Sequence, residues 1–153
     1  MNLRMFTAAA FVVALLPAAI ANAQPSAADS HGYGREVAVE IPATIDGILA
    51  AVDQHVAAID QTIAGGKLAR VHGEAFAARD LLAALPEKVA GLNEAEAKAL
   101  DAAIGRIRQQ AALLDKFGDA DDAAQTRAVL ARFKTEIAGI RQQLAGKSSR
   151  SAP

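Results

Sequence analysis

The sequence predicts an all-α protein, an antiparallel up-down-up-down four-helix bundle that follows a signal peptide and a flexible leader. Four stretches carry apolar residues at alternating spacings of four and three, the pattern of helices that bury one stripe. Glycines, prolines and short polar segments separate these stretches. Short connections between helices of the same period favour antiparallel neighbours.

The N-terminus has the pattern of a secretory signal. Arg4 is the only charged residue before Asp29, and it precedes an apolar run at 5–16 and an Ala-Asn-Ala motif at 21–23. Cleavage is predicted after Ala23, which would place the mature chain in the periplasm or outside the cell. The alternative is an uncleaved membrane anchor, but the apolar run is shorter than the ~20 residues that span a bilayer.

The composition of the mature chain excludes several classes of function. Cleavage removes both methionines and leaves 17 acidic against 15 basic residues, a net charge of −2. Such a chain has no basic excess for nucleic acid or anionic lipid. The absence of cysteine excludes disulfides, a lipid-anchoring cysteine and a covalent c-type haem. Stability must therefore come from the packing of one core.

Residues 24–41 are predicted to form the flexible leader, because prolines, glycines and serines interrupt any periodicity there. His31 lies in the middle of this segment. An exposed histidine can bind a metal at the periphery of a protein, but one histidine is a weak ligand set. A plain linker is the simpler interpretation.

The first helical hairpin is predicted to fold at Gly65-Gly66. Its first helix should begin just after Pro42, since proline suits a first helical turn. The glycine pair should end that helix, because glycine accepts the left-handed geometry of a helix end. The second helix should run over 68–85 and end at Pro86. The apolar positions of the two helices are Ile45, Leu49, Val52, Val56, Ile59 and Ile63, then Leu68, Val71, Ala75, Ala78, Leu82 and Leu85.

The second hairpin is predicted from its caps. Asn93 followed by Glu96 has the spacing of a capping box, which marks the start of the third helix. That helix should stop at Gly118, Asp119 should cap the fourth helix, and Gly146 should end it. The predicted divisions are a signal peptide at 1–23, a leader at 24–41, the bundle at 42–146 and a disordered tail at 147–153.

Charges beside the apolar stripes predict which helices are neighbours. The first helix carries aspartates, and the fourth helix carries basic residues, at successive heptad e positions. Antiparallel packing would pair Asp46 with Arg141, Asp53 with Lys134 and Asp60 with Arg127. Such exposed pairs select partner and direction and add little stability.

The two histidines of the bundle are predicted to face different seams. His55 should lie across the first hairpin from Glu74, and a hydrogen bond between them is the favoured interpretation. His72 should face the third helix near Arg108, which would repel a cation. The alternative is transition-metal ligation through His55, Glu74, His72 or His31.

No catalytic centre is predicted, so the chain is not expected to be an enzyme. There is no cysteine nucleophile, and the serines lie in the terminal segments, where a rigid catalytic triad cannot form. No resident cofactor is expected apart from a transition metal in the alternative above.

Over Pro42 to Leu144 the sequence resembles the small periplasmic cytochrome b562-like and cytochrome c′-like four-helix bundles in size, topology, export and alanine-rich helices. The b562-like family binds haem through a methionine on its first helix and a histidine on its last. The mature chain has no methionine on its first predicted helix and no histidine on its last. It also lacks the C-x-x-C-H motif of the c′-like family. The resemblance implies the architecture of a haem-less relative or a convergent bundle.

Three functions remain open. The leading one is a non-enzymatic exported module that binds a protein partner in the cell envelope or contributes to envelope stress tolerance. It predicts an exposed apolar patch around Phe76, whose alternative place is the core. The second is a metal-homeostasis accessory, and the third carries haem or another small ligand between Ala75, Ala78 and Ala111. The protein is expected to be a monomer or homodimer, without nucleic-acid binding or stable membrane insertion after cleavage.

Overall fold

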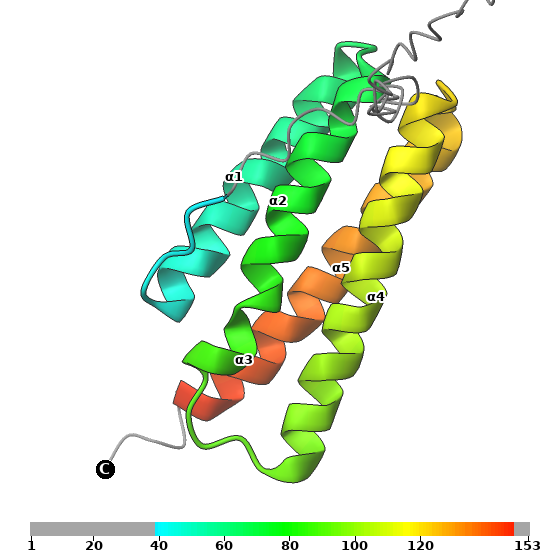
Figure 1. The fold of residues 1–153 in the computed structure, drawn as a ribbon. Coiled ribbons are helices and arrows are strands. Elements are labelled where there is room, and N and C mark those ends of the chain that lie inside the picture. The colour runs from blue at the N-terminus through cyan, green and yellow to red at the C-terminus, as the bar shows by residue number, and fades with distance from the viewer. Residues whose placement is uncertain (1–38, 149–153) are drawn as a thin grey trace, which may run out of the picture. The chain divides into compact units, whose positions relative to one another are not determined.

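The computed structural model describes residues 39–148, which form four long helices packed against one another without any strand (Figure 1). This confirms the predicted all-α, four-helix fold. The predicted signal peptide, most of the leader with His31, and residues 149–153 lie outside the described part. The long helices are α1 (Ile45–Ala64), α2 (Val71–Ala83), α4 (Glu94–Asp119) and α5 (Ala123–Ser148), and the short ones are η1 (Leu68–Arg70) and α3 (Leu85–Lys88).

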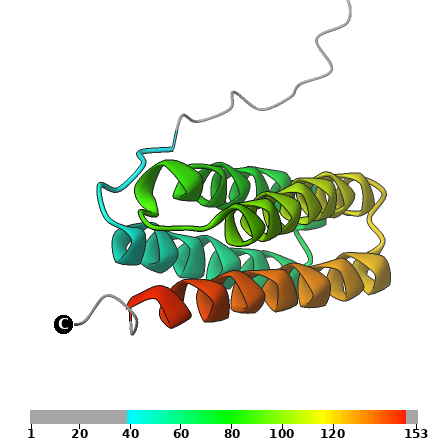
Figure 2. The same cartoon turned by 90° about the horizontal axis from the view of Figure 1, so that it is seen from below.

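Helices that follow one another along the chain are neighbours in space. α1 packs against α2, α2 against α4, and α4 against α5, whereas α1 and α5 approach each other less closely. Figure 2 shows α2 and α4 lying over α1 and α5. Within residues 39–148, no helix is both long and apolar enough to cross a membrane.

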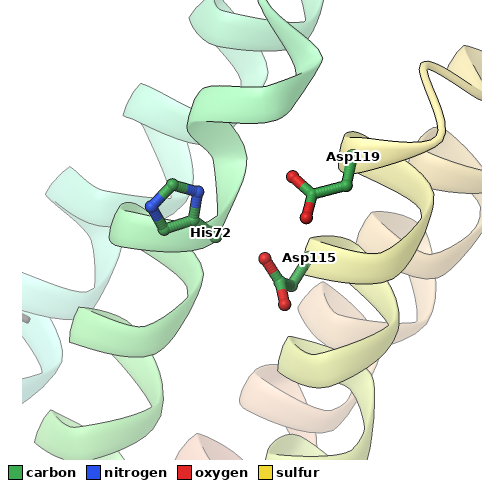
Figure 3. Close-up of side chains that lie close together, drawn as sticks. All are labelled: His72, Asp115 and Asp119. Carbon is green, nitrogen blue, oxygen red and sulfur yellow. The ribbon is translucent and has the colours of Figure 1, made fainter. Parts of the chain in front are cut away.

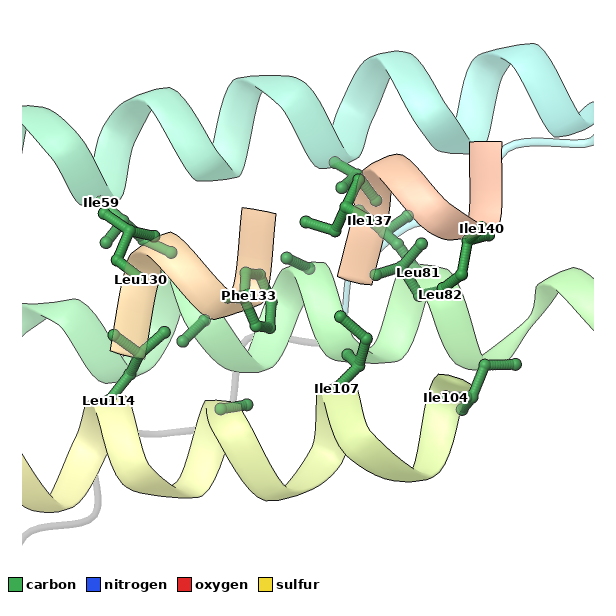
Figure 4. Close-up of a cluster of buried hydrophobic side chains, with 14 of the residues drawn as sticks. Ile59, Leu81, Leu82, Ile104, Ile107, Leu114, Leu130, Phe133, Ile137 and Ile140 are labelled. Atoms are coloured by element: carbon green, nitrogen blue, oxygen red, sulfur yellow. The ribbon is translucent and has the colours of Figure 1, made fainter. Parts of the chain in front are cut away.

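The predicted apolar stripes meet in the core between the helices (Figure 4). Phe133 of α5 and Ile107 of α4 are fully buried, and so is Leu81 of α2, which lies beside the predicted stripe. Ile45 and Val56 of the predicted stripe are only partly buried. Each fully buried side chain of this size contributes about 1.5–3 kcal/mol. Apolar packing is therefore the main source of stability.

The ends of α1 are set by a threonine and a glycine. The helix begins at Ile45, and the Thr44 hydroxyl accepts a hydrogen bond from the Gly47 N–H at 3.1 Å. Thr44, and not Pro42, therefore begins the helix, and Pro42 packs back onto Gly47. The predicted end at 65–66 is confirmed, because Gly66 adopts a φ of +66°.

The connection from α2 to α4 differs from the prediction at Pro86. α2 already ends at Ala83, and Pro86 lies in the first turn of α3, where its missing N–H costs nothing. The capping box is confirmed. The Asn93 side chain accepts from the Glu96 N–H, and the Glu96 carboxylate accepts from the Asn93 N–H, both at 2.9 Å.

The caps predicted around α5 are wrong. Asp122, and not Asp119, caps this helix, since its carboxylate accepts from the Gln125 N–H at 3.0 Å. The helix also continues through Gly146 to Ser148. Glycine permits a helix end but does not impose one, because the helical conformation is open to it as well.

Antiparallel pairing of α1 with α5 is confirmed, but the predicted register is wrong by seven residues. Asp60 pairs with Lys134 at 2.6 Å, and Asp53 pairs with Arg141 at 2.7 Å. Asp46 and Arg127 have no ion-pair partner among the described residues. These pairs are largely exposed, and exposed pairs contribute under about 1 kcal/mol. Core packing, and not the charges, sets the register.

Candidate metal-binding site

His72 lies in the first turn of α2 and faces α4, as predicted, but the residues grouped with it are not the predicted ones. Asp115 and Asp119 point from α4 towards α2, and one ligand atom from each of the three side chains lies within 4.8 Å of the others (Figure 3). The prediction that Arg108 would face His72 is wrong. The two carboxylates of Asp115 and Asp119 lie beside His72, where the guanidinium of Arg108 was predicted.

The error in this register follows from the connection at 89–93. In Figure 1 the chain continues past the end of α2 before it reverses, so that α4 starts beyond that end. Residues of α4 therefore meet α2 one heptad later than a tight turn would give. This displacement brings Asp115 to the position predicted for Arg108.

A hydrogen bond fixes the imidazole of His72. Its Nδ1 lies 2.8 Å from the carbonyl oxygen of Ala69. Because a carbonyl oxygen can only accept, Nδ1 donates this hydrogen bond, and Nε2 is the ring nitrogen whose lone pair stays free in this tautomer. Metal-binding histidines are typically oriented by such a bond from their other nitrogen.

Phe76 supports the same imidazole. The rings of His72 and Phe76 have centroids 6.4 Å apart, and the guanidinium of Arg79 lies 4.6 Å from the Phe76 centroid. Phe76 is partly buried against the core. The expected exposed apolar patch around it is wrong, since Ile41 is the single exposed large hydrophobic residue in the described range.

The two aspartates repel each other. Burial and the neighbouring Asp119 carboxylate raise the pKa of the Asp115 carboxyl, while His72 acts in the opposite direction. Asp119 is the last residue of α4, at the negative end of the helix dipole, where carboxylates are disfavoured. The arrangement is therefore one that a positive charge would stabilise.

Gly118 holds this end of α4 in place. It is buried, and a Cβ atom at this position would lie 2.6 Å from the carbonyl oxygen of Leu68 in η1. Only glycine allows the backbones to come this close. The contact sets the position of Asp119 relative to the beginning of α2, so Gly118 is a packing residue of the site and more than a stop signal.

The predicted hydrogen bond between His55 and Glu74 is confirmed. Nδ1 of His55 and Oε2 of Glu74 are 2.7 Å apart, on the seam between α1 and α2. The pair offers two ligands, fewer than the three protein ligands of typical zinc sites. In the described part of the chain, the only group of three convergent metal ligands is His72 with Asp115 and Asp119.

Sequence reasoning missed Asp115 and Asp119, although it contained a signal for them. Residues four apart lie on one face of a helix, and this pair falls where the helix dipole disfavours negative charge. Local rules are most often broken at functional sites. The signal could not name His72 as the third ligand, because that step needs the register of α2 against α4.

An open hollow of about 310 Å³ borders Asp119, one of the three side chains. Residues 66–70 line one side of it, and Gly118, Asp119 and Asp121 line the other. Asp119 belongs to both the hollow and the candidate site. Ala69, whose carbonyl orients His72, also lines the hollow, so a cation held by the three ligands would lie next to this space.

Comparisons with known proteins do not assign this chain to a family. No protein-family model, curated protein or solved structure matches it. The resemblance to the haem-binding bundles therefore stays a prediction. The candidate site stands on the geometry of His72, Asp115 and Asp119.

Proposed function

We propose that this protein is an exported helical bundle that binds a divalent transition-metal ion through His72, Asp115 and Asp119. The observation that carries the proposal is the convergence of these side chains from α2 and α4 within 4.8 Å. His72 supplies an oriented nitrogen, and the aspartates supply oxygen. In this proposal the bundle is a rigid support that brings the three ligands together.

The mixed ligand set favours a first-row transition metal, with Zn²⁺ as the reference ion. Imidazole nitrogen suits zinc, nickel, copper and iron, whereas Ca²⁺ and Mg²⁺ prefer oxygen ligands alone. The mature chain has no cysteine or methionine for Cu(I), which prefers sulfur. Two carboxylates would neutralise the charge of a divalent ion, and the ion would remove their repulsion.

The other two candidate functions have less support. A protein-partner module was expected to expose an apolar patch around Phe76, and Phe76 instead packs against His72 and Arg79. A haem or small-ligand carrier would need space between Ala75, Ala78 and Ala111. These alanines are fully buried, where their small side chains allow the helices to pack closely.

Zinc titration of the metal-free protein without residues 1–23 tests the proposal. Free Zn²⁺ at 100 times its dissociation constant should stabilise the fold by about 2.7 kcal/mol. For a bundle of this size, that stabilisation raises the melting temperature by roughly 10 °C. Calorimetry should give one ion per chain, and the His72→Ala variant should lose both the heat and the shift.

The His55→Ala variant is the matched control. It removes an imidazole from the neighbouring seam, and it should keep the zinc affinity of the unaltered protein. Equal loss of binding in both variants, or retention of zinc by His72→Ala, would place the ion elsewhere. Absence of any zinc-dependent stabilisation would refute the proposed function.

A further inference from the structure

We infer that the site binds its metal together with a small polycarboxylate anion, which occupies the hollow beside the metal. This inference rests on the proposed metal-binding function and names a second ligand for the same site. It follows from the unfilled coordination positions, from two cationic side chains on the hollow, and from the balance of charge around them.

Three protein ligands do not complete the coordination of the ion. A tetrahedral ion would keep one position for another ligand, and an octahedral ion would keep three if each carboxylate supplies one oxygen. Asp119 lies on the boundary between the three ligands and the hollow. An anion in the hollow would therefore approach the ion from the side of Asp119.

Lys67 and Arg70 line the hollow and have no ion-pair partner within the described chain. Gly66, with its φ of +66°, turns the chain directly before Lys67. A guanidinium binds carboxylate oxygens through paired hydrogen bonds, and lysine adds a mobile positive charge. Residues 66–70, which line the hollow, thus include two side chains with the chemistry of an anion-binding surface.

The charge balance makes anion binding depend on the metal. The charges that line the hollow cancel, Lys67 and Arg70 against Asp119 and Asp121, and Asp115 of the metal site adds one negative charge, so the metal-free hollow does not attract an anion. A divalent ion reverses this balance and leaves one excess positive charge. Metal should therefore bind first, and the anion second.

The space suits a small chelator. A volume of about 310 Å³ is at the lower end of the range for small-molecule sites, roughly 300–1,000 Å³. A polycarboxylate can place some oxygens on the metal and others on Arg70 or Lys67, which a monocarboxylate does less well. The chemistry therefore favours a metal–polycarboxylate chelate over a bare aqua ion.

Equilibrium dialysis with radiolabelled citrate as the probe tests this inference. The protein should bind one citrate per chain when free Zn²⁺ is buffered at a saturating level, and none without zinc. The Lys67→Gln/Arg70→Gln variant should bind citrate about tenfold more weakly or worse, the effect of losing one or more charge-assisted contacts. Its affinity for zinc alone should be nearly unchanged.

Lys98→Gln/Arg132→Gln is the matched control, because both residues are exposed, lie outside the hollow and change the net charge equally. It should bind citrate like the unaltered protein. Zinc binding without retained citrate, or equal citrate affinity in the two double variants, would overturn the inference and leave the metal site standing. Absence of zinc binding would overturn both.

Discussion

The contact between Gly118 and Leu68 predicts an unusual cost for adding one methyl group. In Gly118→Ala, the new Cβ would lie 2.6 Å from the Leu68 carbonyl oxygen and 3.3 Å from its carbonyl carbon. Both atoms belong to the backbone and cannot rotate away. An ordinary contact begins at about 3.4 Å, so α4 and η1 must separate by roughly 0.8 Å. Such overpacking costs about 1–3 kcal/mol.

Gly105→Ala in the same helix is the matched control. Gly105 is exposed in α4, and nothing lies within 4 Å of the Cβ that would be added there. Alanine in a helix is more favourable than glycine by about 1 kcal/mol, and both variants gain this amount. The difference in stability between the two variants therefore isolates the steric cost at Gly118, about 1–3 kcal/mol.

Urea unfolding of the metal-free proteins, followed by circular dichroism, measures this difference. Gly105→Ala should be more stable than the unaltered protein, and Gly118→Ala less stable than Gly105→Ala by the steric cost. Equal stability of the two variants would refute the close approach of α4 to η1. The position of Asp119 beside His72 would then lose its physical basis, because the same contact sets it.

Two further predictions concern Asp115 and Asn93. Burial and the neighbouring Asp119 raise the pKa of the Asp115 carboxyl, so the carboxyl proton of Asp115 is bound more tightly in the folded protein than in the unfolded chain. In the metal-free protein, Asp115→Asn should raise the free energy of unfolding at neutral pH by under about 1 kcal/mol, since solvent screens this partly exposed group. This gain in stability should disappear in urea titrations at a pH below the ordinary pKa of an aspartate, because Asp115 is then protonated in both the folded and the unfolded state. If the gain persisted at that pH, ionisation of Asp115 would not be its cause. Asn93→Ala removes the cap of α4 and should cost about 1 kcal/mol, whereas an unchanged urea midpoint would mean that the capping box contributes nothing.

The sequence was sufficient for the elements and insufficient for their register. Apolar spacing located the helices, and the Asn93 capping box located the start of α4. The register errors on α1/α5 and α2/α4 both amount to one heptad. An apolar pattern that repeats every seven residues is satisfied again after a shift of seven, and exposed ion pairs are too weak to select one solution.

The site depended on that register. His55 and Glu74 were found because a tight glycine turn leaves little freedom in how α1 meets α2. His72 was assigned the wrong neighbour because the longer connection at 89–93 displaces α4. The role of Gly118 could not be read from sequence, since a glycine that ends a helix and one that permits a close backbone contact look alike.

The most direct test of the metal site is ¹⁵N nuclear magnetic resonance of the imidazole nitrogens during zinc titration. The chain has three histidines, at 31, 55 and 72, so each ring can be followed separately. The proposal predicts that Zn²⁺ shifts a ring-nitrogen signal of His72 at one equivalent, while the signals of His55 and His31 stay unchanged. A shift at His55 or His31 without one at His72, or no shift at all, would contradict it.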